Sequence, residues 1–265
     1  MQTSIVIFTK VPKSGETKTR LTTDRGGVLT HDEARMLYEG CLVDVLNVCL
    51  KADCGAVKVC YNADGDPDCL EQLLARSSDR SKIVEVYPDQ GGSFDSCMQY
   101  AADHILKEAS GSGVLNSVVI VGGDIPTLQP YILQDAVRKL KKLASSSQTD
   151  PAGMALVEGA CQEGGFSLVG FTATTPFAFA GVFYNQNGVT ALDMLVAKAV
   201  SNRIPLGVVE AIPDVDIPVD LAGMIPVVKA LKAAAEHDAT ILAPEHTLRV
   251  LDELGLESTA TPSQR

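Results

Sequence analysis

Short apolar runs rich in β-branched residues alternate with longer segments of helical spacing, and this alternation restricts the fold more than any other feature of the chain. The run over residues 118–121 is apolar throughout, which indicates a strand buried on both faces. The order is typical of a mostly parallel sheet with right-handed crossovers. The pattern predicts strands over 4–9, 56–61, 83–87, 118–121 and 155–158, with helices over 31–50, 69–76, 94–107 and 130–144.

Thr30 and Glu33 form a capping box that supports the start of the predicted helix at residue 31. After about residue 160 the alternation of predicted strands and helices becomes less regular. The length of 265 residues is compatible with one large domain or two small ones. We expect a single domain over residues 1–256 and a flexible polar tail over 257–265. The later segments are predicted as strands over 164–171 and 207–211 and helices over 189–200, 219–235 and 245–254.

Charge and composition exclude several classes of protein. The net charge is −11 and the pI about 4.8, so nucleic acid and anionic membranes are disfavoured as partners. No apolar run approaches the roughly 20 residues of a membrane span. The seven cysteines include no C-x-x-C pair, which indicates reduced thiols and a cytoplasmic location. A homo-oligomer is left open.

A cationic loop follows the first predicted strand. Residues 1–25 carry five lysines and arginines against Glu16 and Asp24, a net charge of +3 in an otherwise acidic chain. In open α/β sheets ligands bind beyond the carboxyl ends of strands, where such side chains can hold a di- or triphosphate. Gly15 allows a close backbone approach. Charge alone leaves a solvated basic loop equally open.

The loop also carries a resemblance. Residues 10–21 read K-x-P-x-x-G-x-x-K-T-R-L, and this segment resembles the glycosyltransferase-A-like family of nucleotide-diphospho-sugar transferases. The family is similar to the guanylyltransferases that activate 2-phospholactate and molybdopterin. Residues 90–94, 121–128 and 214–221 resemble its Q-x-G-x-L, G-x-D-x-P-x-L and D-x-D-x-x-x-D-L segments. The resemblance implies a single α/β glycosyltransferase-A-like domain, with a mostly parallel central sheet flanked by helices.

The resemblance also implies a site. Asp124 follows the buried strand 118–121 and would bind Mg²⁺ or Mn²⁺, although a turn-forming role is the alternative. Asp216 would be the second metal ligand. Asp214 could take its place, and one of the two could merely cap the helix over 219–235. The implied nucleotide-binding residues are Lys10, Gly15, Lys18, Thr19, Arg20, Gln90, Gly91, Gly92 and Gly123.

Two segments depart from the family pattern. The family's G-P-A-E-D-G-G-Y-x-L-x-G corresponds to residues 159–170, where Ala160, Gln162, Glu163 and Phe166 replace Pro, Glu, Asp and Tyr. Glu163 is therefore the one carboxylate left there, and it is our candidate catalytic base or acceptor-positioning group alongside Asp124. Residues 93–96 lack the arginine of the family's L-G-x-R.

These features favour transfer of a sugar from a nucleotide-diphospho-sugar, assisted by Mg²⁺ or Mn²⁺. Nucleotidyl transfer from a nucleoside triphosphate to a small phosphorylated acceptor is the alternative, because the Lys-Thr-Arg-Leu segment occurs in both classes. A non-catalytic nucleotide-binding module is a third hypothesis, supported by the altered segment at Gln162 and Glu163. The expected partners are a nucleotide sugar or nucleoside triphosphate and a small acceptor.

Overall fold

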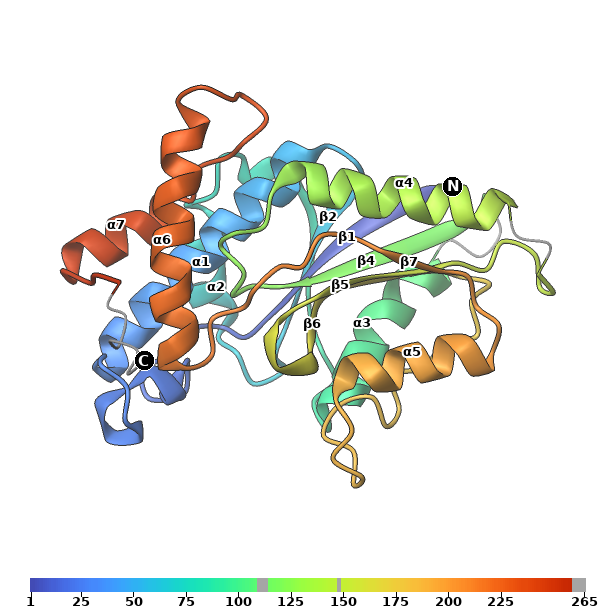
Figure 1. Cartoon of the computed structure of the whole chain (residues 1–265), viewed down its shortest axis with the longest axis horizontal. Helices are drawn as coiled ribbons and strands as arrows, with labels where there is room; N and C mark the ends of the chain where they lie inside the picture. Colours follow the sequence, from blue (N-terminus) through green and yellow to red (C-terminus); the bar gives the residue numbers. More distant parts are fainter. Residues whose placement is uncertain (109–113, 147–148, 259–265) are drawn as a thin grey trace, which may run out of the picture.

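The structure is a computed structural model that describes residues 1–108, 114–146 and 149–258. Within these residues the chain forms one seven-stranded sheet between two layers of helices (Figure 1). The strand order is β3-β2-β1-β4-β6-β5-β7. The strands are β1 (Gln2–Thr9), β2 (Ala56–Tyr61), β3 (Ile83–Pro88), β4 (Asn116–Gly122), β5 (Leu156–Ala160), β6 (Phe166–Thr172) and β7 (Leu206–Val208).

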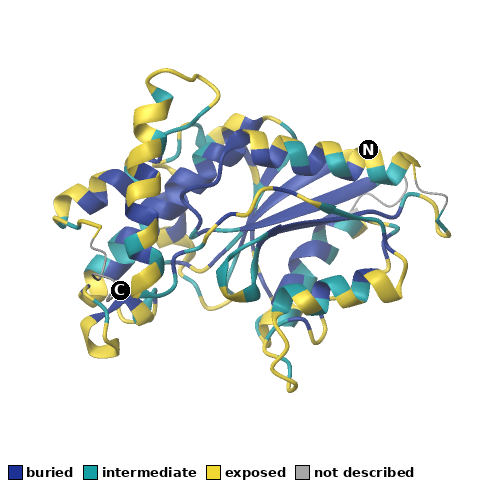
Figure 2. Ribbon diagram, viewed as in Figure 1, coloured by how far each residue is buried: buried dark blue, intermediate teal, exposed yellow. Residues whose placement is uncertain are grey.

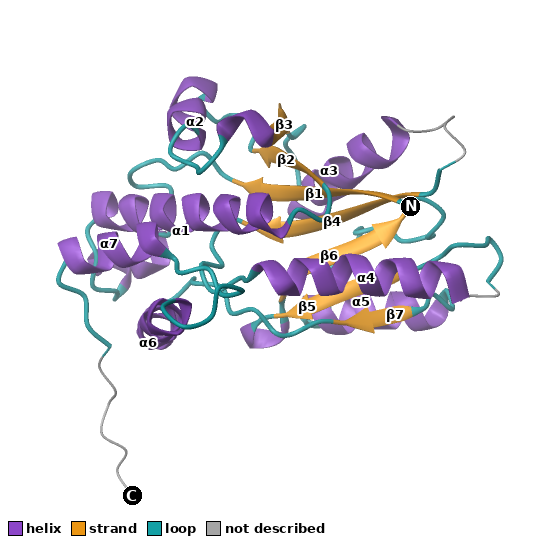
Figure 3. Cartoon of the chain, turned by 90° about the horizontal axis from the view of Figure 1, so that it is seen from above, coloured by secondary structure: helices purple, strands orange, loops and turns teal. Residues whose placement is uncertain are grey.

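The helices fall into three groups. Helices α1, α2 and α4 cover one face of the sheet, and α3 and α5 cover the other (Figure 3). Helices α6 and α7 pack against the N-terminal half of α1, beyond the sheet edge. The helices are α1 (His31–Ala52), α2 (Pro67–Leu74), α3 (Phe94–Glu108), α4 (Pro130–Ser146), α5 (Ala191–Ser201), α6 (Pro218–Ala235) and α7 (Glu245–Glu253), with short 3-10 turns at Thr19–Leu21, Thr23–Arg25, Arg80–Lys82 and Gln162–Gly164.

The predicted mostly parallel sheet is confirmed. Every neighbouring pair of strands is parallel except the two that involve β6, which runs antiparallel to both β4 and β5. As a result, the carboxyl ends of β1, β4 and β5 and the beginning of β6 lie at one edge of the sheet. Loops from distant parts of the sequence therefore meet there.

The central strands are buried on both faces, as their composition predicts (Figure 2). Ile5 and Ile7 of β1 pack under α1, while Val6 faces the opposite layer with α3. Val118 and Ile120 of β4 are likewise at most 2% exposed. Side chains alternate between the two faces of a strand, so both layers of helices share one sheet as their floor.

Most predicted elements are present, and the differences at their ends have local causes. The capping box of Thr30 and Glu33 begins α1, as predicted. Helix α2 begins at Pro67 rather than at residue 69, because the Asp66 carboxylate accepts hydrogen bonds from the first turn and proline fits the first helical position. The strand expected over 164–171 begins at Phe166, after the 3-10 turn.

The strand expected over 207–211 is shorter. β7 ends at Val208, but the chain continues beside β5, with hydrogen bonds from Val209 N to Glu158 O and from Ile212 N to Ala160 O. This path carries residues 214–217 to the carboxyl edge.

All seven cysteines are free, which agrees with reduced thiols.

No helix in the described part of the chain is both long and apolar enough to span a membrane. Residues 259–265 of the predicted tail lie outside the described residues. Ser258, just before them, donates a hydrogen bond to the Ala222 carbonyl of α6.

Candidate functional site

A cleft of about 1180 Å³ opens at the carboxyl edge of the sheet. The loop after β1 forms one side of it, and the loop after β4 lies at its floor. The turn between β5 and β6, the segment before α5 and the segment after β7 form the other side. The cleft therefore collects the segments that carry most of the predicted site residues.

The loop after β1 is built to direct a lysine inward. The Lys13 carbonyl accepts a hydrogen bond from Thr17 N at 3.0 Å, and Thr17 Oγ1 accepts one from Lys13 N at 2.8 Å. Gly15 lies within this turn at φ +80°, a conformation that glycine adopts at little cost. Gly15 does not line the cleft. The turn leads into Lys18, whose own backbone is left-handed at φ 50°.

Lys18 is held between two carboxylates. Its Nζ lies 2.5 Å from Asp124 Oδ2 and 2.6 Å from Asp216 Oδ1, and its side chain is only 10% exposed. Burial by itself lowers the pKa of Lys18. The charges and hydrogen bonds of the two carboxylates raise that pKa by more, so it lies above its ordinary value. Lys18 therefore keeps a permanent positive charge in the centre of the cleft.

Tyr38 of α1 supports this arrangement, and its sequence context gave no indication of that role. Its ring lies below the Lys18 ammonium, 5.7 Å from Nζ to the centroid, and its hydroxyl is 2.7 Å from Thr9 Oγ1. A Cβ added at Gly123 would lie 3.1 Å from the Tyr38 hydroxyl, a tight contact that a side chain there could make only if Tyr38 moved slightly. Burial and Asp124 raise the pKa of Tyr38 to about 12, which keeps the phenol neutral.

Asp216 is free to pair with Lys18 because another residue caps α6. Asp220 Oδ2 accepts hydrogen bonds from Asp216 N at 3.0 Å and Ile217 N at 2.9 Å. The sequence leaves open whether Asp214 or Asp216 caps this helix, and in the structure Asp220 does so instead. A Cβ at Gly122 would lie 2.8 Å from Asp124 Oδ1, which explains the glycine before the other carboxylate.

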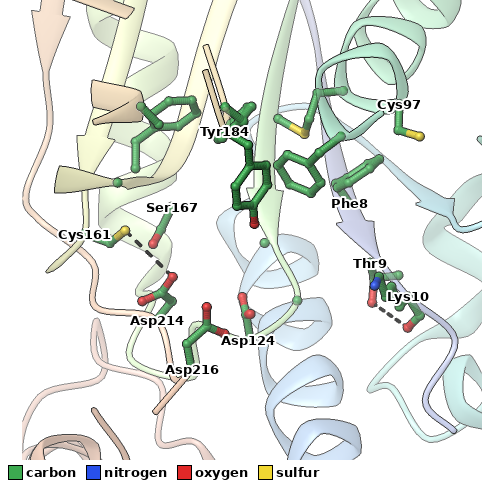
Figure 4. A pocket seen from close by; sticks show the side chains of 18 of the residues that line it. Phe8, Thr9, Lys10, Cys97, Asp124, Cys161, Ser167, Tyr184, Asp214 and Asp216 are labelled. Atoms are coloured by element: carbon green, nitrogen blue, oxygen red, sulfur yellow. Dashed lines mark hydrogen bonds between the residues drawn. The ribbon is translucent and has the colours of Figure 1, made fainter. Parts of the chain in front are cut away.

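Asp214 lies beside these two carboxylates and behaves differently. Burial, together with the charges of Asp124 and Asp216, raises the pKa of Asp214 to about 6. The Gln162 side chain fixes its backbone through Nε2 to Asp214 O at 2.7 Å and Oε1 to Asp214 N at 3.2 Å. Gln162, which replaces an acidic family residue, is therefore a structural clasp. Figure 4 shows the three aspartates gathered at one end of the cleft.

The other predicted site residues line the cleft, with the exception of Gln90. Arg20 has a 62% exposed side chain, and its Nη1 lies 3.9 Å from Asp216 Oδ2. Glu163 lines the cleft at φ 58°. Gln90 lies outside the cleft and faces a neighbouring hollow instead. The remaining predicted residues that line the cleft are Lys10, Thr19, Gly91, Gly92 and Gly123.

The cations of the cleft are clustered. Among the described residues that line it, lysine and arginine occur only in the loop after β1, whereas carboxylates are more widely spread and include Glu16 of that same loop. The facing side contributes Glu163, Asp214 and Asp216, together with aromatic side chains that include Tyr184. Figure 4 shows the Tyr184 ring standing within the cleft, with its hydroxyl directed toward the aspartates. The sequence analysis did not find Tyr184.

The donor chemistry of the acidic end fits a hard divalent cation. Asp124 and Asp216 offer carboxylate oxygens, the ligands that Mg²⁺ and Mn²⁺ prefer. No group of three or more His, Cys, Asp or Glu side chains within the described ranges is arranged to hold a metal ion alone. Mg²⁺ is commonly bound by one or two carboxylates plus substrate phosphates. Lys18 already contacts Asp124 Oδ2 and Asp216 Oδ1, which leaves Asp124 Oδ1 and Asp216 Oδ2 for an ion that binds together with a phosphorylated substrate.

A comparison with known protein families identifies the family of this chain. The family profile described as "Uncharacterized protein conserved in bacteria (DUF2064)" matches residues 45–186, more than half of the chain. The chain belongs to the DUF2064 family. The match includes Asp124, Glu163 and Tyr184, and it leaves the cationic loop and residues 214–220 outside. A search of functionally curated proteins finds no match.

Solved structures establish the fold. One is a protein from Desulfovibrio desulfuricans G20, provisionally assigned as a nucleotide-diphospho-sugar transferase, with 24% identity, a TM-score of 0.70 and coverage of 96% of this chain and 97% of that chain. Another is a nucleotidyl transferase from Methanothermobacter thermautotrophicus, with 14% identity, a TM-score of 0.50 and coverage of 86% and 99%. These similarities confirm the predicted glycosyltransferase-A-like fold for this DUF2064 protein.

Proposed function

We propose that this DUF2064 protein transfers a sugar from a nucleotide-diphospho-sugar to a small acceptor. The observation that carries the proposal is the clustering of cations in one loop of the cleft. Lys10, Lys18 and Arg20 fit a diphosphate, while the facing side contributes Glu163, Asp214 and aromatic side chains and no described lysine or arginine. The assignment of the similar Desulfovibrio protein supports the same class of donor.

Lys18 and Arg20 would hold the diphosphate. Lys18 stays charged because two carboxylates stabilise its ammonium, and Arg20 has exposed N–H groups that can form paired hydrogen bonds with phosphate oxygens. Lys10 lies on the same side. As the sugar leaves, negative charge develops on the diphosphate, and fixed cations stabilise it without reorganisation.

Asp124 and Asp216 would hold Mg²⁺ or Mn²⁺. When bound, such an ion would neutralise part of the charge on the leaving diphosphate. Glu163 would accept the proton from the attacking hydroxyl of the acceptor, because it lines the cleft on the side opposite the cations. The two halves of the cleft thereby have separate tasks.

Nucleotidyl transfer is the second candidate, favoured by the permanent charge of Lys18 at the centre of the cleft. In that reaction Lys18 and Arg20 would stabilise the α-phosphate under attack, and pyrophosphate would leave. The name of the similar Methanothermobacter protein supports this class. Against it stands the acidic facing side, which opposes the approach of a phosphorylated acceptor.

The test is a thermal-shift screen of nucleotide sugars and nucleoside triphosphates, each with Mn²⁺ and with a chelator. A ligand that binds the native state raises apparent stability by mass action. The expected result is a larger shift with a nucleotide sugar than with any triphosphate, followed by release of nucleoside diphosphate on incubation with acceptors. A preference for triphosphates, with pyrophosphate release, would replace the proposal by the second candidate. Binding without turnover of either would favour a non-catalytic module.

A further inference from the structure

Aromatic side chains are concentrated in the cleft. The chain contains seven Phe, six Tyr and no Trp, and six of these side chains line this one cleft. Five of the six form a connected group. Phe94 is at its centre, 4.6 Å from Phe183, 5.7 Å from Phe8 and 6.3 Å from Tyr184 between ring centroids, and Phe166 lies 5.1 Å from Phe183. An apolar wall therefore faces the acidic end of the site.

Tyr184 is the most unusual member of this group. It is 86% exposed, although large aromatic side chains gain most from burial. Its backbone is left-handed at φ 48°, a conformation that costs energy for a bulky residue and persists only where the surroundings impose it. Its ring stands in the cleft rather than in the core (Figure 4). Exposure and strain together mark a side chain held ready for a ligand.

Two side chains of α3 fix the segment that precedes Tyr184. The Asp95 carboxylate accepts hydrogen bonds from Gly181 N at 2.7 Å and from Phe183 N at 2.9 Å. Gln99 Oε1 accepts a further hydrogen bond from Phe179 N at 3.0 Å. The segment that leads to Tyr184 is thereby fixed to the same helix that contributes Phe94. Asp95 acts as a positioning residue for the aromatic wall.

The charge around the wall restricts what can bind there. The described side chains that line this side of the cleft include Glu163 and Asp214 but no lysine or arginine. Among the described residues that line the cleft, Lys18 is the cation with a largely buried side chain, and it is already paired with Asp124 and Asp216. Bringing a phosphate close to these carboxylates would be unfavourable, because like charges repel strongly at partly buried sites.

We infer that Phe94, Phe183 and Tyr184 form the acceptor platform, and that it takes an uncharged alcohol with a flat, largely apolar ring and no phosphate. That this platform binds the acceptor rests on the proposed function. Aromatic pairs contribute stabilisation beyond the area that they bury, so the ring would stack against Tyr184. The hydroxyl of the acceptor alcohol would then lie on the Glu163 side of the cleft.

The test uses two probes that share a ring and differ in a phosphate: 4-nitrobenzyl alcohol and 4-nitrobenzyl phosphate. Because the chain has no tryptophan, Tyr184→Trp places a single fluorescent reporter at the platform. We expect saturable quenching by the alcohol and at least tenfold weaker binding of the phosphate. No saturable quenching, or equal affinity for the two probes, overturns the inference.

Calorimetry on unlabelled variants removes dependence on the reporter. Tyr184→Ala should weaken alcohol binding by about two- to tenfold, the range for loss of one aromatic pair. Asp95→Ala should weaken it similarly while thermal unfolding remains cooperative. Tyr131→Ala is the matched control, since Tyr131 is 39% exposed and lies outside the cleft. Equal losses in the control and in Tyr184→Ala overturn the inference.

The two proposals fail in different ways. Quenching by the alcohol in a protein that binds no nucleotide sugar supports the platform as a ring-binding site and overturns the proposed function. Nucleotide-sugar binding in a protein that gives no quenching overturns the platform and leaves the proposed function standing. Enhanced binding of the alcohol in the presence of the nucleotide sugar supports both.

Discussion

Lys18 Nζ and Asp124 Oδ2 lie 2.5 Å apart, although 106 residues separate them in the sequence. Lys18 lies in the loop that follows β1, and Asp124 follows the neighbouring parallel strand β4. The pair therefore ties two loops of the carboxyl edge together. It also brings the cationic loop and Asp124 into the same cleft.

Lys18→Met should lower the free energy of unfolding at pH 7.5. The substitution keeps the apolar stem but leaves Asp124 and Asp216 without their shared cation, and we expect a loss of about 1–3 kcal/mol. The folded-state pKa of Lys18 is raised above 10.5, so its contribution is complete below that pH and is lost only as the pH rises further. Urea denaturation measures the change. Lys13→Met, which removes an exposed pair with Glu16, is the control, and equal losses in both variants would contradict the prediction.

Asp214→Asn should raise the free energy of unfolding above that of the natural protein at neutral pH but not at acid pH. The folded-state pKa of Asp214 is raised from 3.8 to about 6, so the folded protein favours the protonated carboxyl. The stability that this protonated form contributes is complete below about pH 3.8 and is lost as the pH rises through 6. Asparagine carries no charge at any pH. We expect the variant to gain about 1 kcal/mol over the natural protein at pH 7.5 and almost nothing at pH 4, after allowance for partial solvent screening. A gain that is the same at both pH values would contradict this prediction.

Arg20→Ala should weaken nucleotide binding by about 1.5–3 kcal/mol, the range for a hydrogen bond to a charged group. The guanidinium is 62% exposed and lies only at the limit of an ion pair with Asp216, so little structure depends on it. Calorimetry with the best ligand of the nucleotide screen measures the loss. Lys13→Ala serves as the control because Lys13 does not line the cleft. Similar losses in both variants would indicate a diffuse basic patch.

Asp124→Asn decides between a metal ligand and a turn residue. Asparagine keeps the shape of the side chain but is a much poorer ligand for a hard cation. We expect the Mn²⁺-dependent part of the nucleotide affinity to disappear while the fold survives, as measured by titration with Mn²⁺ and with a chelator. Asp135→Asn, a surface position paired with Lys139, should leave the Mn²⁺ dependence intact. An unchanged dependence in Asp124→Asn would remove this residue from the proposed mechanism.

The sequence predicts the sheet well because burial leaves a strong local signal. The strand over 56–61 has the predicted ends, and the run over 118–121 lies within β4. Errors arise at the ends of elements, where single hydrogen bonds decide the boundary. The Asp66 carboxylate moves the start of α2, and after Val208 the chain keeps only isolated backbone bonds to β5, from Val209 N and Ile212 N, so β7 is shorter than predicted.

The candidate site is only partly predictable. Lys18, Asp124 and Asp216 meet because loops at the carboxyl ends of parallel strands converge, and this follows from topology. Tyr38 approaches the site from the N-terminal half of α1, and Tyr184 from the long connection before α5. No local spacing in the sequence encodes such approaches. Gln90 matches a motif yet faces away from the cleft, because a motif fixes residue types rather than side-chain directions.

The reversed strand β6 has a consequence for how this protein family can diversify. The turn between Ala160 and Phe166 is a hairpin that joins adjacent strands, so its length and residues can change without disturbing β1 or β4. The proposed donor half of the cleft depends on those two strands. Under the proposed function, substitution or lengthening of this one hairpin would change the acceptor while the donor stays the same, which makes it the first segment to exchange when engineering acceptor choice.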